Sequence, residues 1–261
     1  MKQTTIAVLS NSGGAGKSTL VRNLAYELDR SGLQVALLDL DPQHNLDLFC
    51  GLDIEIPMID TIVGMLGEKY DRDWHLVPVP NEKNIHVCRG HLGMAELQNE
   101  FVARRGSEHI LANKLKKKPL GHDVILIDCP ATLGKICENA VVAADYVLIP
   151  LILQDKALTG LDGLLNWLKY LSDDLNLQPA PQVLGIVPYA YNEKSQTHRQ
   201  CMEQLKFVAA RARLRMFETI DNSLEIMNAN GNGLAIGKFR PVHKTVEQFR
   251  NICQQLLQTI G

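Results

Sequence analysis

The chain has 261 residues, of which 46% are hydrophobic and 21% charged, a composition that excludes a disordered, collagen-like or coiled-coil protein. Its 27 Lys and Arg residues nearly balance 29 Asp and Glu residues, and the net charge of −2 excludes a uniformly basic protein while allowing a local basic patch. The six cysteines form no CxxC pair and no signal-peptide pattern is present, so we expect a soluble, cytoplasmic protein with free, mostly buried thiols.

Short apolar runs rich in Val, Ile and Leu alternate along the chain with longer segments of helical periodicity. These runs are nearly continuous in apolar residues, as expected for strands of a parallel sheet that is buried on both faces. In chain order, the predicted strands are residues 5–10, 34–40, 84–88, 123–128, 146–151 and 182–188.

Between the predicted strands, apolar residues recur with the spacing of amphipathic helices. The clearest stripes lie within residues 20–28, 158–171 and 242–260, and the last comprises Val242, Val246, Phe249, Cys253, Leu256, Leu257 and Ile260. Alternating strands and helices specify an α/β fold, with a doubly wound, mostly parallel sheet and helices on both faces. Because no linker interrupts the pattern, we predict a single domain over residues 1–261.

A glycine-rich segment follows the first predicted strand and precedes the first predicted helix. It reads Ser10-Asn-Ser-Gly-Gly-Ala-Gly-Lys-Ser-Thr19 and includes Ser12, Gly13, Gly14, Ala15, Gly16, Lys17, Ser18 and Thr19. Glycines allow tight turns that direct successive N–H groups at an anion, and a helix N-terminus adds further donors. Lys17 would neutralise phosphate oxygens, and the Ser18 hydroxyl would be a ligand of Mg²⁺. The segment therefore predicts the phosphate-binding loop of a P-loop NTPase.

Three aspartates at predicted strand ends support this prediction. Asp39 and Asp41 follow the second strand, and Asp128 ends the strand at residues 123–128. Carboxyl ends of parallel strands share one edge of the sheet with the loop after the first strand. A carboxylate at that edge can hold Mg²⁺ through water or orient an attacking water, as phosphoryl transfer requires.

In order and spacing, these motifs resemble the ParA/MinD family of deviant Walker-box ATPases. The resemblance extends from GGAGKST through DLDPQ, DVILIDCPATLG, AADYVLIPL and TIDNSLEIMNANGNG to the last helix. It implies an ATPase that dimerises around ATP and Mg²⁺, with the loop around the triphosphate and Asp41 positioning the lytic water. Asp39 and Asp128 would support the metal, and Pro188 and Tyr189 would lie near the adenine.

The chain departs from the family at position 12, where the family loop carries a lysine that reaches the partner's phosphates. Ser12 is short and uncharged, so either the trans charge is missing or another lysine supplies it. Lys156, just beyond the predicted strand at residues 146–151, is the candidate, although an exposed lysine paired with Asp155 would explain it equally well. This combination resembles the McdA-type ATPases that position carboxysomes.

The resemblance also implies non-specific DNA binding in the ATP-bound state, and two basic clusters are candidates for it. The selected residues are Arg211, Arg213 and Arg215 in the first cluster, and Lys238, Arg240, Lys244 and Arg250 in the second. Phosphate neutralisation with counterion release requires no base-specific contacts. For either cluster alone, a solvated charged face is an equally good interpretation.

Several functions remain open from the sequence. The first choice is an ATP-dependent homodimer that positions or partitions a large, carboxysome-like cytoplasmic cargo on nucleoid DNA through a ParB- or McdB-type adaptor. Plasmid or chromosome partition, a MinD-like membrane-surface ATPase and a hydrolysis-deficient scaffold are alternatives. We expect the final helix to pack on the domain, which argues against membrane binding. An iron-protein reductase and an amide-forming ATPase lack support from cysteine spacing or from a second catalytic site.

Overall fold

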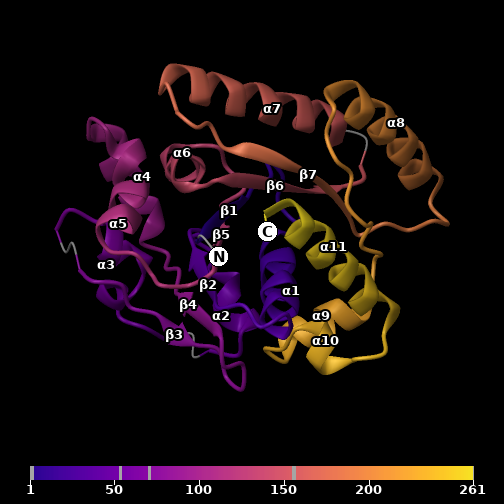
Figure 1. Cartoon of the computed structure of the whole chain (residues 1–261), viewed down its shortest axis with the longest axis horizontal. Coiled ribbons are helices and arrows are strands. Elements are labelled where there is room, and N and C mark those ends of the chain that lie inside the picture. Colours follow the sequence, from indigo (N-terminus) through magenta and orange to yellow (C-terminus); the bar gives the residue numbers. More distant parts are fainter. Residues whose placement is uncertain (1–2, 53–54, 70–71, 155–156, 261) are drawn as a thin grey trace.

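The computed structural model describes residues 3–52, 55–69, 72–154 and 157–260 (Figure 1). Within them, seven strands form one sheet in the order β3-β4-β2-β5-β1-β6-β7, and all neighbours are parallel except β3 and β4. The strands are β1 (Thr4–Val8), β2 (Val35–Asp39), β3 (Val77–Pro78), β4 (Ile85–Cys88), β5 (Val124–Asp128), β6 (Tyr146–Ile152) and β7 (Gln182–Tyr189).

Helices cover both faces of this sheet, and each face has its own apolar core (Figure 1). One face carries α3 (Ile62–Leu66), α4 (Met94–Ala103), α5 (Ile110–Lys117), α6 (Lys135–Ala143), α7 (Ala157–Asp174) and α8 (Gln196–Ala212). The other carries α1 (Lys17–Arg30), α2 (Asn45–Phe49), α9 (Leu224–Gly231), α10 (Ile236–Phe239) and α11 (Lys244–Ile260). Two short 3₁₀ helices, Met58–Asp60 and Ser107–His109, complete the helical segments of the described residues.

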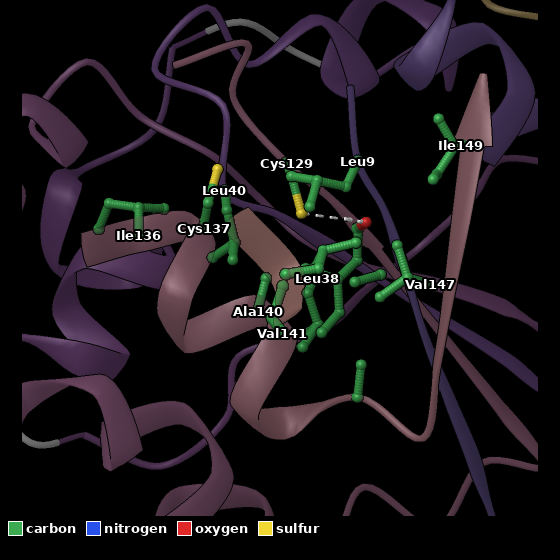
Figure 2. Packing of buried hydrophobic residues seen from close by; sticks show 14 of the residues in the cluster. Leu9, Leu38, Leu40, Cys129, Ile136, Cys137, Ala140, Val141, Val147 and Ile149 are labelled. Atoms are coloured by element: carbon green, nitrogen blue, oxygen red, sulfur yellow. Dashed lines mark hydrogen bonds between the residues drawn. The ribbon is translucent and has the colours of Figure 1, made fainter. Parts of the chain in front are cut away.

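Residues of the central strands alternate between the two cores. In β1, Ala7 belongs to the first core, whereas Ile6 and Val8 belong to the second. Figure 2 shows the first core from close by, with Val141 of α6 and Leu38 of β2 among its buried residues. Because each strand residue is buried on one side or the other, the strands carry the continuous apolar runs that the sequence shows.

The predicted α/β class and all six predicted strands are confirmed, with ends that differ by one or two residues. The antiparallel edge strand β3 was missed because it has only two residues, one of them Pro78, which has no N–H to donate. The six cysteines are free and buried, as expected.

The prediction for the last helix is confirmed in part. Of the predicted stripe, Val246, Phe249, Cys253 and Leu256 are buried, and the helix packs on the domain as expected, where it contacts α1. Including Val242 in the apolar stripe was wrong, because this residue precedes the helix and its side chain is 99% exposed.

Candidate functional site

The glycine-rich segment forms the connection between β1 and α1. The helix begins at Lys17, as the sequence predicts, whereas the strand ends at Val8, two residues earlier than predicted. Gly14 and Gly16 have φ values of 74° and 82°, a left-handed conformation that residues with a Cβ atom rarely adopt. Gly16 caps α1, so the loop leads directly into the unpaired N–H groups of the first helical turn.

This loop borders a cavity of about 570 Å³. Residues 13–19 line the cavity together with Asp41 and Tyr189, so most of the predicted nucleotide-binding residues surround one space. The ammonium group of Lys17 lies 3.5 Å from the carbonyl oxygen of Ser12 and is buried within the site. Backbone donors, a helix N-terminus and a lysine around one cavity are the arrangement that binds a polyphosphate.

Two aspartates meet at the same edge of the sheet. Asp39 of β2 and Asp128 of β5 are register partners on adjacent parallel strands, and both are fully buried. One oxygen of Asp39 accepts a hydrogen bond from the N–H of Asp41 at 3.0 Å, but its Oδ2 and both oxygens of Asp128 have no hydrogen-bond partner.

The environment of these carboxylates favours their protonated forms. Burial raises the pKa of Asp128 to about 7, although nearby Ser18 and Lys17 oppose the effect. Burial, followed by repulsion from Asp128, also raises the pKa of Asp39 well above its ordinary value. Two adjacent buried carboxylates with unpaired oxygens are a suitable anionic site for a divalent cation, which would compensate both charges.

Asp41 lies two residues beyond β2 and, unlike Asp39, lines the cavity. Its Oδ1 accepts a hydrogen bond from the N–H of Gln43 at 2.9 Å, which fixes the carboxylate at the cavity wall. The predicted separation of roles between these two aspartates therefore has a geometric basis: one is buried at the strand end, and the other faces the ligand space.

The other residues selected from the sequence lie in different surroundings. Ser12 borders a second cavity rather than the first, and Lys156 lies outside the described residues. Tyr189 packs on the loop, because a Cβ atom on Gly16 would lie 2.6 Å from its ring, and burial raises the pKa of its hydroxyl. Pro188 is buried within β7, where its carbonyl oxygen accepts a hydrogen bond from the N–H of Ile220 at 2.9 Å.

One wall of the first cavity was not predicted. It consists of mainly apolar side chains from α2, α4 and the start of α6, namely Phe49, Met94, Ala95, Gln98 and Ile136. These residues belong to ordinary amphipathic helices, and nothing in their sequence distinguishes a cavity wall from core packing.

The two predicted basic clusters differ in their pairing. All four cations of the second cluster contact acids, in the pairs Lys238–Glu82, Arg240–Glu225, Lys244–Asp221 and Arg250–Glu247 at 3.5, 3.1, 2.6 and 2.7 Å. In the first cluster, Arg215 donates to the neutral Gln255 carbonyl and Thr259 hydroxyl. Arg211 and Arg213, at the end of α8, are exposed and have no acidic partner in the part of the chain described.

Comparisons with known proteins agree with this geometry. The model of the AAA domain family matches residues 3–179. Chromosome partitioning protein ParA of Myxococcus xanthus is 31% identical over 204 residues, which cover 77% of this chain and 70% of that protein. Chromosome-partitioning ATPase Soj of Thermus thermophilus is 28% identical over 263 residues, 99% of this chain and 97% of that protein.

Solved structures show the same fold. A Cyanothece McdA variant in complex with ATP superposes with a TM-score of 0.85 at 24% identity, over 97% of this chain and 96% of that chain. None of the helices in the described residues has the length and apolar character needed to cross a membrane.

Proposed function

Because the chain belongs to the AAA domain family and, within it, to the ParA/MinD family, we propose that it hydrolyses ATP to position or partition a large cytoplasmic cargo. ATP with Mg²⁺ would join two copies of the chain, and hydrolysis would separate them. The observation that carries this proposal is the meeting, at one sheet edge, of the phosphate-binding loop and two buried carboxylates with unpaired oxygens.

The residues at this edge fit a magnesium ion. Among the described residues, Oδ2 of Asp39 and both oxygens of Asp128 have no hydrogen-bond partner, so these carboxylates can bind a cation. Ser18 would provide a hydroxyl ligand beside them. When bound, Mg²⁺ supplies charge stabilisation at the phosphate oxygens. Lys17 neutralises further oxygens, the backbone of residues 13–19 surrounds the phosphates, and Asp41 orients water from the cavity wall.

The proposed DNA-binding surface centres on the end of α8. Arg211 and Arg213 are free to neutralise phosphates, and the hydrogen-bond partners of Arg215 are neutral groups that do not compensate its charge. The second cluster contributes less, since each of its cations would first have to leave an acid. Binding through phosphates alone accounts for cargo movement on nucleoid DNA without sequence preference.

The packing of α11 favours DNA over a membrane as the surface on which the protein acts. A membrane-binding amphipathic helix needs a free apolar face, whereas the apolar face of α11 is buried against α1. Chromosome-partitioning relatives and the McdA neighbour support cargo positioning through an adaptor of ParB or McdB type. The cargo is accordingly a carboxysome-like body, a plasmid or a chromosome.

Two measurements test this proposal. Phosphate release from ATP should depend on Mg²⁺ and be lost in Asp41→Asn. Absence of turnover in the unmodified protein would refute the ATPase activity and indicate a nucleotide-binding scaffold instead.

DNA binding should require ATP and fall steeply with salt. Replacing Arg211 and Arg213 with Glu should abolish it, whereas Lys244→Ala should have a small effect. DNA binding that is independent of ATP or salt would refute the DNA part of the proposal.

A further inference from the structure

Asn11 connects the phosphate-binding loop to a helix that is distant in the sequence. The side-chain Nδ2 of Asn11 donates a hydrogen bond to the carbonyl oxygen of Gly160, at 2.7 Å. Gly160 lies in the first turn of α7, 149 residues away in the sequence. The contact therefore joins the loop at one end of β1 to the helix that follows β6.

Both residues are suited to this contact. A Cβ atom on Gly160 would lie 3.1 Å from Oδ1 and 3.3 Å from Nδ2 of Asn11, so a side chain at this position would crowd the amide and force it to shift by a few tenths of an ångström. Glycine is a poor helix former, and its presence in α7 is explained by the close approach of Asn11. Asn11 also stands where the ordinary Walker pattern has glycine, so it is a side chain that phosphate binding alone does not require.

The contact lies outside the nucleotide cavity. A separate cavity of about 520 Å³ lies on this side of the loop and is lined in part by Asn11, Ser12, Gln154 and Gly160. Residues 13–19 of the loop line the nucleotide cavity, whereas Asn11 and Gly160 both line the second cavity. A change in the loop has a direct path to α7 that does not pass through the sheet.

Beyond Gly160, the path continues to the proposed DNA-binding surface. Helix α7 spans 18 residues and packs against α8, which ends beside Arg211 and Arg213 (Figure 1). The loop, α7 and α8 thus form a continuous set of packed elements between the phosphate site and the free arginines.

We propose that Asn11 is a positioning residue that couples nucleotide occupancy of the phosphate-binding loop to α7 and, through α8, to DNA binding. This inference rests on the proposed function. Phosphates held by the backbone of residues 13–19 fix the start of the loop, and the hydrogen bond from Asn11 then holds the first turn of α7. Without nucleotide, only the protein's own contacts hold the start of the loop, so the hydrogen bond holds the first turn of α7 less firmly.

Three variants and a matched control test the coupling. Asn11→Ala removes the donor, Gly160→Ala displaces it, and a third variant combines both changes. Gly163→Ala is the control, because it makes the same change three residues further along α7, where a Cβ atom meets nothing within 4 Å. Both glycine replacements favour the helix, so a loss of function specific to Gly160→Ala cannot arise from weakening α7.

The primary measurement is amide hydrogen exchange of residues 158–164 with and without a non-hydrolysable ATP analogue. In the unmodified protein and in Gly163→Ala, the analogue should slow exchange about 2- to 10-fold, the range one net hydrogen bond provides. At an analogue concentration that saturates each variant, Asn11→Ala and the combined variant should show no slowing, and Gly160→Ala should show less slowing than Gly163→Ala. The affinity of the ATP-bound protein for DNA should fall by a similar factor, with no additional loss in the combined variant.

Two results would overturn the inference. One is exchange in α7 that does not respond to nucleotide in the unmodified protein; the other is a response that survives Asn11→Ala. A failure of the proposed function differs from both, because it appears in the unmodified protein as absent nucleotide binding or absent ATP-dependent DNA binding. Nucleotide-dependent exchange in α7 that requires Asn11 supports the coupling even if the DNA part of the proposed function is wrong.

Discussion

Replacing Asp128 with Asn should change how the stability of the nucleotide-free protein depends on pH. Burial raises the pKa of this carboxyl from the ordinary 3.8 to about 7, so the folded protein binds a proton that the unfolded chain releases at lower pH. Between these two values, the free energy of unfolding falls as pH rises, by up to about 1.4 kcal/mol per pH unit. Fully expressed, the loss reaches about 4 kcal/mol at pH 8.

Part of this loss falls below pH 5, and relaxation around the coupled carboxyls of Asp39 and Asp128 reduces the rest, so we expect a loss of about 1–3 kcal/mol between pH 5 and pH 8. The amide introduced by Asp128→Asn is neutral at every pH, so this variant should not show that loss and should gain about 1–3 kcal/mol relative to the unmodified protein between pH 5 and pH 8. Histidines contribute equally to both proteins, so the difference isolates the carboxyl.

Urea denaturation at pH 5, 6, 7 and 8, without Mg²⁺ or nucleotide, measures this difference. Asp173→Asn is the control, since Asp173 is exposed near the end of α7 and should show the unmodified pH dependence. With Mg²⁺ and ATP, the unmodified protein should regain its stability at pH 8, but Asp128→Asn should gain little. If Asp128→Asn and the unmodified protein show the same pH dependence, the buried carboxylates carry no electrostatic strain, and the argument for a metal site at this edge is refuted.

Two further substitutions test the packing around the phosphate-binding loop. Gly16→Ala should destabilise the fold by about 1–3 kcal/mol and weaken ATP binding at least about 10-fold, because its φ of 82° is strained and its Cβ would meet the ring of Tyr189. Calorimetry beside Gly163→Ala measures both effects, and unchanged ATP affinity would contradict the loop geometry. Arg22→Met should cost about 2–4 kcal/mol in urea denaturation, because it removes the bidentate partner that lies 2.6 and 2.8 Å from the buried Glu82 and leaves it only Lys238, at 3.5 Å. Adding Glu82→Leu should restore most of that loss, and a further loss in the double variant would show that the pair contributes more than mutual neutralisation.

The sequence predicted the parts of the site that depend on local chemistry. The glycines, Lys17 and Ser18 indicate a phosphate-binding loop because backbone geometry and charge require those residue types in that order. Parallel strand ends placed Asp39 and Asp128 at one edge, and the β2–β5 register makes them neighbours.

Contacts between distant segments were not predictable. The pairing of each cation in the second basic cluster with an acid depends on side chains brought together by the fold, for example Lys238 with Glu82. The contact of Asn11 with Gly160 has no local signal, because each residue alone is explained by a turn or a helix position. The prediction for Val242 was wrong for a different reason: apolar periodicity does not show at which residue a helix begins, and Val242 lies before the first residue of α11.

The most direct test of the account is calorimetric titration of the protein with ATP in the presence and absence of Mg²⁺. We predict saturable binding of one ATP per chain that needs Mg²⁺ for full affinity and is weakened at least about 10-fold by Lys17→Ala, which removes a charge-assisted phosphate contact. Absence of binding heat at several temperatures, or binding that is equally tight in Lys17→Ala, would contradict the assignment of the β1–α1 loop as a triphosphate site.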